Sequence, residues 1–226
     1  MPSLRSTILS LSPTGLLWPS STTMIDLVGA LTVTPAGTPT SVAGPSLGAP
    51  SALSLDVGDT LTIADHANID LGATFSIAFA LRKTATTGNR ILVKANDAAA
   101  SGYQVYLTSN LMRLQTGDAS NYLRQTTVDT ATTWKFYTFI RDGASSIFEL
   151  DGTDDTNVSS STAMTDSNQD LIIGPDNVTY EIAFLAWWKS AITAANNQTI
   201  YDARDEPDPS TNASAELASA AAAAEF

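Results

Sequence analysis

The sequence contains no cysteine and a single histidine, and its basic residues are outnumbered by acidic ones. The absence of cysteine excludes disulfide bonds, thiolate metal sites and a cysteine nucleophile. Eleven Lys and Arg against 23 Asp and Glu give a formal net charge of −12. Nucleic acid and anionic lipid are both bound by basic surfaces, so this charge disfavours both as partners.

Long hydrophobic runs are also missing. No apolar stretch approaches the roughly 20 residues that a membrane-spanning helix needs. The apolar residues of 1–13 are too interrupted to form the continuous core of a signal peptide. We therefore expect no membrane partner. Hydrophobic residues still make up 43% of the chain, which is enough to fill the core of one large domain.

Recognisable catalytic sets are scarce as well. His66 lies in a polar turn segment beside Asp65, a poor setting for the base of a catalytic triad. Glu149 and Asp151 stand at alternate strand positions, as retaining glycosidases require to hold two carboxylates about 5–5.5 Å apart. Asp151 precedes Gly152, however, and Asp-Gly favours a hairpin turn. We expect a non-enzymatic protein; a glycoside hydrolase or lyase would have to depend on Glu149.

Alternating segments separated by turn residues dominate the chain. Residues 134–141 alternate and turn at Asp142-Gly143, and residues 146–150 turn again at Asp151-Gly152. Such pairs between alternating runs are the strongest short-range signal for hairpins. Residues 75–82 place large apolar side chains on one face and small residues on the other. The pattern predicts an all-β, antiparallel two-sheet sandwich.

The segments between these strands predict a single domain. The Pro-rich residues 35–51 are interpreted as a long crossover loop, and Ala191 to Ala203 as the single short helix of the body. We divide the chain into an N-terminal arm with the first strand (1–15), the sandwich (16–205) and an Ala-rich C-terminal tail (206–226). Alanine favours helix, but the tail has no strong apolar stripe to pack.

The order and spacing of the elements resemble the LamG-like, concanavalin A-like jelly-roll domains over roughly residues 8–205. Ile8 to Pro19 is similar to the family's opening strand, and Leu53 to Ile63 resembles its apolar strand and Asp-rich turn. Further segments follow in the family's order: Asp65 to Leu71, Phe75 to Ile77, Ile91 to Lys94, Gly102 to Leu107, Trp134, and Leu150 to Gly152. The resemblance implies a jelly-roll sandwich of the type found on phage virions.

The resemblance also implies where calcium would bind, and here the chain departs from the family. The family's penultimate strand often carries an acidic pair at the sandwich rim, and the matching positions are Ala183 and Phe184. Calcium needs about six to eight oxygen ligands. Four aspartates remain as candidates for contributing to such a site, although scattered aspartate in turns is the favoured interpretation: Asp56, Asp59, Asp65 and Asp97. We expect no cofactor, with calcium as the alternative.

Aromatic side chains are the candidates for ligand binding. Trp187 and Trp188 are adjacent on a strand and must face opposite ways. Trp188 is therefore either packed beneath the 191–201 helix or exposed as a platform for a sugar ring. Tyr103, Tyr106 and Tyr122 are alternative platforms.

Taken together, these patterns favour a structural or interaction protein of a virus particle, as a capsid decoration, head fibre or tail-surface module of a tailed phage. Its expected partners are other virion proteins, host-surface glycans and further copies of itself. Its expected location is the particle surface, after assembly in the host cytoplasm. The alternative is a lectin-like carbohydrate-binding module assisted by calcium.

Overall fold

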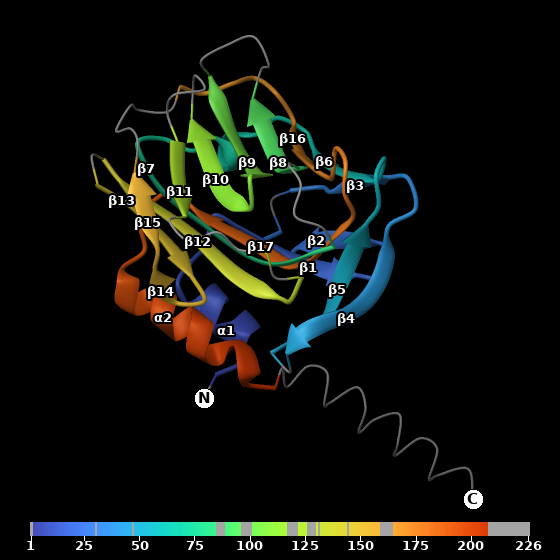
Figure 1. Cartoon of the computed structure of the whole chain (residues 1–226), viewed down its shortest axis with the longest axis horizontal. Helices are drawn as coiled ribbons and strands as arrows, with labels where there is room; N and C mark the ends of the chain where they lie inside the picture. Colours follow the sequence, from blue (N-terminus) through green and yellow to red (C-terminus); the bar gives the residue numbers. More distant parts are fainter. Residues whose placement is uncertain are drawn as a thin grey trace, which may run out of the picture.

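The computed structural model describes residues 2–29, 31–46, 48–84, 89–95, 101–116, 122–125, 130, 132–143, 145–158 and 165–207. Two antiparallel sheets pack face to face, and two short helices lie beneath the first of them (Figure 1). The predicted jelly-roll sandwich with a short C-terminal helix is thereby confirmed. None of the described helices has the length and apolar character required to cross a membrane.

The first sheet has nine strands within the described residues, ordered β14-β13-β12-β7-β17-β1-β2, with β5 also paired to β17 and β4 paired to β5. The strands are β1 (Gly15–Ser20), β2 (Thr23–Asp26), β4 (Thr40–Ser46), β5 (Ala49–Leu55), β7 (Thr74–Lys83), β12 (Lys135–Asp142), β13 (Ser145–Leu150), β14 (Thr153–Asp154) and β17 (Tyr180–Trp188).

The second sheet has eight strands within the described residues, ordered β15-β11-β10-β9-β8-β16-β6-β3. They are β3 (Thr34–Ala36), β6 (Thr60–Ile63), β8 (Asn89–Ala95), β9 (Gly102–Thr108), β10 (Leu111–Thr116), β11 (Tyr122–Gln125), β15 (Thr156–Val158) and β16 (Leu171–Ile173). The helical segments are α1 (Leu4–Ser10), α2 (Ala194–Asp202) and the 3-10 turns η1 (Ala67–Ile69) and η2 (Ala203–Asp205).

The main core lies between the two sheets and follows the alternation of the sequence. On β7, Phe75, Ile77 and Phe79 are at most 2% exposed and belong to this core. Ala78 and Ala80 point to the other side of the same strand. Because these side chains are small, the helices can approach the sheet closely there, and the neighbouring Ser76 on the same face is buried with its hydroxyl donating to the Ser190 carbonyl.

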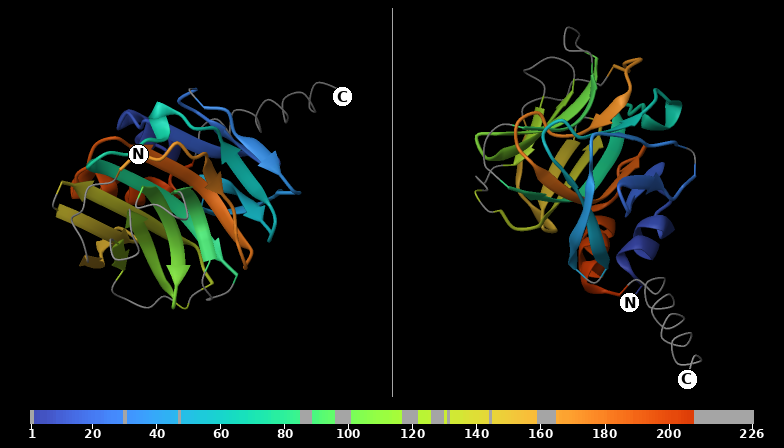
Figure 2. Two further views of the ribbon diagram at one scale, coloured as in Figure 1. Left: turned by 90° about the horizontal axis from the view of Figure 1, so that it is seen from above. Right: turned by 90° about the vertical axis from the view of Figure 1, so that its right-hand side faces the viewer.

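A second apolar cluster lies between the first sheet and the helices. Leu4 and Ile8 from α1 and Ile200 from α2 pack against residues of the sheet that include Phe184 and Trp188. The right-hand view of Figure 2 shows α1 (blue) and α2 (red) side by side beneath the strands. Every residue of β17 is consequently buried, as expected of a strand covered on both faces.

The two-residue turn at Asp151-Gly152 sets the strand register where the Asp-Gly signal predicts it, whereas Asp142 is still part of β12 and pairs with Ser145. Leu150 pairs with Thr153 across Asp151-Gly152, and both turn residues have positive φ, 51° and 74°. This is the backbone of a type I′ hairpin turn, which asparagine, aspartate and glycine accept most readily. The Asp151 carboxylate also accepts a hydrogen bond from the Phe136 amide at 3.0 Å and pairs with Lys135 Nζ at 2.7 Å.

The N-terminal segment differs from the prediction. An opening strand is expected over Ile8 to Pro19 and an N-terminal arm over 1–15, but Leu4–Ser10 forms a helix and the first strand begins at Gly15. Ser3 caps it by accepting a hydrogen bond from the Ser6 amide, and Leu4 and Ile8, one helical turn apart, are both 0% exposed. The i, i+4 spacing of these two side chains is helical, so the arm is part of the body.

The Pro-rich segment 35–51 also differs from the prediction, because part of it is a hairpin rather than a loop. β4 pairs with β5, and β5 continues the sheet beside β17. Pro45 is tolerated because β4 pairs on one side only, where a missing amide donor leaves no strand partner unsatisfied. The predicted tail falls mostly on residues 208–226, which lie outside the described residues.

Replacing Ile8 with alanine tests whether α1 belongs to the body. The substitution removes a side chain that is 0% exposed, so we expect the free energy of unfolding to fall by about 2–5 kcal/mol. Leu9 is the matched control, because its side chain is 36% exposed and Leu9→Ala should change stability by only about 0.5 kcal/mol. Urea unfolding of both variants measures this, and equal effects would mean that α1 does not pack as described.

Candidate functional site

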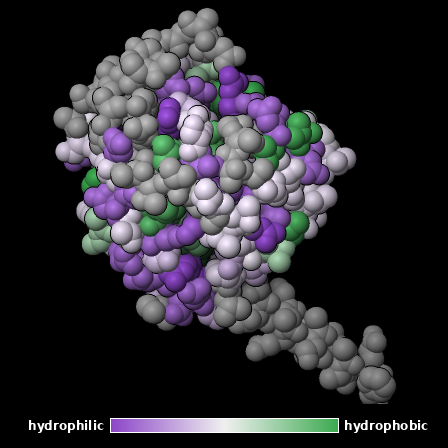
Figure 3. Space-filling view, viewed as in Figure 1, coloured by the Kyte–Doolittle hydropathy of each residue, from purple (hydrophilic) through white to green (hydrophobic). Residues whose placement is uncertain are grey.

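The outer face of the second sheet carries two adjoining depressions. Helices cover the outer face of the first sheet, whereas the strands β8, β9, β10 and β16 present their outward side chains around these depressions. Figure 3 shows hydrophobic side chains scattered among hydrophilic ones on the face turned to the viewer. Side chains from different strands lie next to one another here because the register places Arg90 opposite Tyr106 and Gln104 opposite Gln115.

The first depression, called the polar depression below, has a volume of about 320 Å³. Its lining consists of Arg90, Gln104, Tyr106, Leu107, Thr108, Gln115, Asp176 and Asn177. Gln104 Nε2 donates a hydrogen bond to Gln115 Oε1 at 2.9 Å, which orients both amides. The half-buried ring of Tyr106 is the aromatic member of this group.

The second depression, called the apolar depression below, has a volume of about 360 Å³. Its lining consists of Thr60, Arg90, Val93, Ala95, Gln169, Ile172, Gly174, Pro175 and Asp176. Arg90 and Asp176 line both depressions, and Arg90 Nε lies 3.3 Å from Asp176 Oδ2. This ion pair is the boundary between the two.

The chemistry of the polar depression suits a ligand with many hydroxyl groups. Amide, carboxylate and guanidinium groups offer paired donors and acceptors in fixed planes. An aromatic ring beside them offers an apolar surface with a polar tip. Because the depression is shallow, it fits a ligand that projects from another surface better than one that must be enclosed.

Two of the four aromatic residues predicted to bind ligand are buried. Trp188 is 2% exposed, and its Nε1 donates to the Leu11 carbonyl at 3.0 Å beside α1. Tyr103 is 4% exposed and its hydroxyl donates to the Ile69 carbonyl at 3.1 Å. Burial raises the pKa of the Tyr103 hydroxyl well above its ordinary value. Neither ring offers an open face for a sugar.

The other two predicted residues lie on the second sheet. Tyr106 lines the polar depression. Tyr122 lies on β11 opposite Gln115, and its side chain is outside the described part of the structure. Of the three candidates whose side chains are described, Tyr106 is therefore the one placed where a ligand can reach it.

The aspartates considered for calcium have protein partners. Asp56 Oδ1 accepts from the Thr179 hydroxyl at 2.7 Å, and Asp59 accepts from the amides of Thr38 and Asp56. Asp97 lies outside the described residues. Among those that are described, no group of three or more His, Cys, Asp and Glu side chains is arranged to hold a metal ion. Ala183 and Phe184, where the family carries its acidic pair, are buried in the second cluster.

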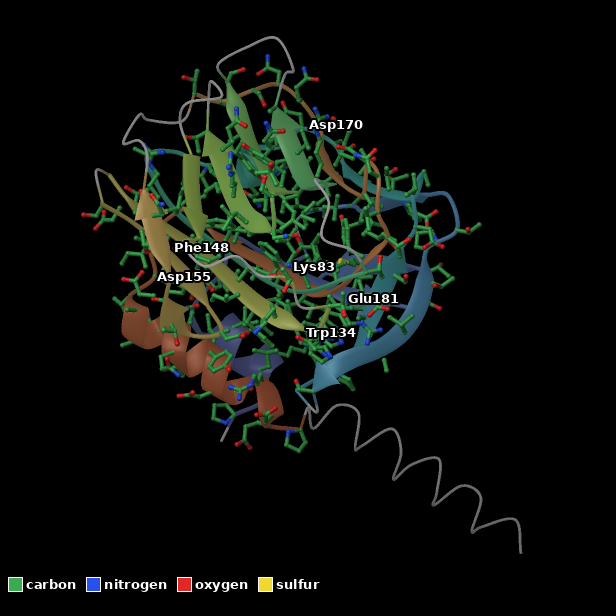
Figure 4. The ribbon with its side chains drawn as sticks, in the orientation of Figure 1. Lys83, Trp134, Phe148, Asp155, Asp170 and Glu181 are labelled. Carbon is green, nitrogen blue, oxygen red and sulfur yellow. The ribbon has the colours of Figure 1, made fainter. Side chains whose placement is uncertain are left out.

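A buried lysine provides positive charge beside Asp65, one of the aspartates considered for calcium. Lys94 is 1% exposed, and its Nζ lies 2.8 Å from Asp65, 2.9 Å from Asp70 and 3.6 Å from Asp166. It also donates to the Ser167 carbonyl. Asp170, labelled at the upper end of the molecule in Figure 4, accepts a hydrogen bond from the Asp65 amide. This ammonium neutralises an acidic cluster that would otherwise attract a cation.

The pKa of Lys94 is raised above its ordinary value. Burial lowers it, but the hydrogen bonds and charges of Asp65 and Asp70 outweigh that effect. A lysine whose pKa is raised in the folded state adds stability that is complete below the unfolded pKa, about 10.4. That contribution disappears as the pH rises through the folded pKa.

The residues considered for catalysis have structural roles. Glu149 is 4% exposed beneath α2, and Asn197 donates to its carboxylate while Thr138 donates to Asn197. Burial raises the pKa of Glu149, and the hydrogen bond from Asn197 opposes this effect. Asp151 belongs to the turn described above. His66 Nδ1 accepts from the Asn68 amide at 3.0 Å and caps η1.

No Gly-x-Ser-x-Gly nucleophile elbow is expected from the sequence, but residues 44–48 do have this spacing. In hydrolases this motif forms a sharp turn from a strand to a helix. Here Ser46 ends β4, next to a hairpin, and its hydroxyl donates to the Arg204 carbonyl. This hydrogen bond attaches the β4–β5 hairpin to η2, which follows the C-terminal helix.

A second surface group, on the outer face of the first sheet, consists of Arg82, Trp134 and Glu181. The Arg82 guanidinium contacts both Glu181 oxygens, at 2.5 and 2.6 Å, and lies 5.6 Å from the centre of the Trp134 ring. Figure 4 labels Trp134 and Glu181 near each other below the middle of the molecule. Since Glu181 is 8% exposed, we interpret this group as an ion pair within the protein rather than as a ligand site.

Sequence reasoning finds Tyr106 but misses the polar residues around it. Gln104 and Gln115 stand at outward positions of β9 and β10, and the alternation of these segments was the available signal for them. Asp176 and Asn177 belong to the loop after β16 and reach the depression only through the fold.

Lys94→Met tests the neutralising role of the lysine. Removing the cation leaves Asp65, Asp70 and Asp166 facing one another, and breaking such a buried pair costs about 3–5 kcal/mol of unfolding free energy. Lys135→Met is the matched control, because the Lys135–Asp151 pair is 25% and 29% exposed and should contribute about 1 kcal/mol or less. Urea unfolding at pH 7 measures both.

The pH dependence of the same variant provides a second readout. The difference in stability between Lys94→Met and the unchanged protein should shrink as the pH rises above about 10.4, because the lysine then loses its charge. The role given to Lys94 would be contradicted if the two proteins differed little in unfolding free energy at pH 7, or if their difference stayed constant as the pH rose above about 10.4.

No protein-family model matches the chain, and no curated protein matches it. Solved structures do. The binding domain of Paraclostridial Mosquitocidal Protein 1 has a TM-score of 0.69 at 11% identity, covering 85% of this chain and 52% of that one. A structure of botulinum neurotoxin type C has a TM-score of 0.71 at 14% identity, covering 89% and 53%. The binding domain of botulinum neurotoxin DC has a TM-score of 0.67 at 15% identity, covering 86% and 52%.

These similarities establish the fold. The chain spans about half the length of the binding domains that it matches, and the identities are too low to carry residue roles across. The resemblance to LamG-like domains holds at the level of the jelly-roll sandwich, while the structural neighbours are toxin binding domains rather than phage proteins. The chain is a jelly-roll sandwich similar to part of the binding domains of clostridial-type neurotoxins.

Proposed function

We propose that this protein is a non-enzymatic carbohydrate-binding module that uses the outer face of its second sheet. The observation that carries the proposal is the polar depression, where Tyr106 stands beside Gln104, Gln115, Asp176 and Arg90. A sugar ring has an apolar face and a rim of hydroxyls. The aromatic ring matches that face, and the planar polar groups match the hydroxyls.

The structural neighbours support this function at the level of their class. Cell entry of botulinum neurotoxin type C depends on interaction with two ganglioside molecules. The binding domain of botulinum neurotoxin DC is known in complex with SialylT. Those ligands belong to domains about twice as long as this chain. For this chain the neighbours support only the general expectation of a surface-recognition module.

The calcium assistance considered from the sequence is not part of the proposal. We propose that glycan binding is independent of calcium, because Lys94 supplies positive charge among the rim aspartates. The polar depression itself offers the amides of Gln104, Gln115 and Asn177 and the paired carboxylate of Asp176, which recognise hydroxyl groups directly.

A second candidate function is the mounting of this module on a larger particle, such as a phage virion. One observation favours it. Both ends of the described body lie on the side of the helices. There α1 packs beside η2, and the Gly48 amide donates a hydrogen bond to the Arg204 carbonyl at 2.9 Å. A module attached from that side keeps its second sheet open to solvent.

Tyr106→Ala tests the carbohydrate-binding proposal. We expect the unchanged protein to bind members of a glycan array with and without chelator, and the variant to lose at least about tenfold in affinity, about 1.4 kcal/mol. Trp134→Ala is the control, because it removes a half-buried aromatic ring from the other sheet. Trp188→Ala is unsuitable, since truncating a buried tryptophan costs about 3–5 kcal/mol of stability.

Three outcomes would contradict the proposal: no glycan bound by the unchanged protein, equal binding by Tyr106→Ala, or loss of binding on chelation. The first two concern the site, and the third concerns calcium alone.

Light scattering of the purified chain tests the mounting proposal. A protein arranged symmetrically on a particle should form a stable homo-oligomer, whose mass does not change with calcium. A monomer at micromolar concentration would contradict the homo-oligomer, while leaving the carbohydrate site unaffected.

A further inference from the structure

The apolar depression places exposed aliphatic side chains in the middle of a sheet. Ile172 is 42% exposed, while its neighbours Leu171 and Ile173 are 2% and 0% exposed in the core. β16 is an interior strand, paired with β6 on one side and β8 on the other. The register sets Ile172 directly opposite Val93 on β8. These two side chains therefore form a continuous outward apolar surface.

A single exposed isoleucine carries little information, because isolated apolar side chains are normal on protein surfaces. Ile172 differs because it lies within a concave site. Val93, Ala95 and Pro175 extend the apolar surface around it, and Thr60 and Gln169 line the same depression with polar groups. A purely apolar ligand would cover Thr60 and Gln169 without offering hydrogen bonds to their polar groups.

The two depressions adjoin, so one ligand can occupy both. Arg90 and Asp176 line each of them, and their side chains are 41% and 45% exposed. The guanidinium is already paired with a carboxylate, so an additional anionic group on the ligand would face Asp176 as well as Arg90. A neutral ligand fits this boundary better than an acidic one.

We propose that the apolar depression is a second subsite, specific for the N-acetyl group of a neutral amino sugar. This inference rests on the proposed function and specifies its ligand class. The acetamido methyl packs on Ile172 and Val93, and the amide lies toward the polar groups of Gln169 and Thr60. The ring of the same sugar, or of the next one, continues across the ion pair to Tyr106 in the polar depression.

The test compares sugars that differ only in the acetamido group. The probes are the methyl β-glycosides of glucose and N-acetylglucosamine, and of galactose and N-acetylgalactosamine, measured by saturation-transfer NMR and competition. We expect the N-acetylated member of at least one pair to bind at least about fivefold more tightly. Its acetyl methyl should receive the strongest saturation of all ligand protons.

Ile172→Thr should remove the saturation of the acetyl methyl and reduce the preference to less than twofold, while binding of the plain glycoside is retained. Threonine keeps the β-branched shape that favours strands, so the fold should be preserved. Ile25→Thr is the matched control, because Ile25 is an isoleucine on a strand of the first sheet and is 46% exposed. That variant should behave as the unchanged protein does.

The outcomes separate this inference from the proposed function. Equal affinity within both pairs, or an unchanged preference in Ile172→Thr, would overturn the N-acetyl subsite, while binding that still depends on Tyr106 would leave the carbohydrate function standing. Failure of all four glycosides, together with a glycan array on which nothing binds, would overturn both.

Discussion

The burial of the first sheet on both faces is the constraint on which the rest of the structure depends. β17 lies at the centre of this sheet, and all of its residues are buried because the second sheet covers one face and α1 and α2 cover the other. Trp187 and Trp188, adjacent in sequence, fill the two opposite clusters. The helices occupy one broad outer face of the sandwich, so the outer face of the second sheet is the one left open.

The polar groups at the edges of the sandwich serve this packing. Lys94 neutralises the aspartates of two loops, and the pair of Asn197 with Glu149 joins α2 to the first sheet. Both are buried and hydrogen-bonded, which is the condition under which a polar group can be taken out of water at moderate cost. A chain with a net charge of −12 thereby holds several of its carboxylates beside hydrogen-bonding or cationic partners.

The open face of the second sheet has the chemistry of recognition. Its two depressions differ in character: one combines an aromatic ring with amides, and the other combines aliphatic side chains with a polar rim. The Arg90–Asp176 pair joins them. A shallow, divided surface of this kind suits the carbohydrate ligand proposed above.

Much of the fold could be predicted because alternation is a local property. The apolar face of β7, the hairpin at Asp151-Gly152 and the α2 segment each depend on neighbouring residues. The prediction was wrong for α1 and for the β4–β5 hairpin. Leu4 and Ile8 become buried only because a sheet formed by distant strands lies above them, and in β4 the local signal of the prolines outweighed the strand pattern.

The sequence by itself determined the fold class, the absence of cysteine chemistry and Tyr106 as one of four candidate aromatic residues. Only the tertiary structure decided that Trp188 and Tyr103 are buried, that Lys94 reaches three aspartates, and that Ile172 lies beside Val93. The physical reason is the range of the interactions. Strand patterns and turns arise between residues close in the chain, whereas burial, charge pairing and the lining of a depression depend on which distant strands become neighbours in the sheet.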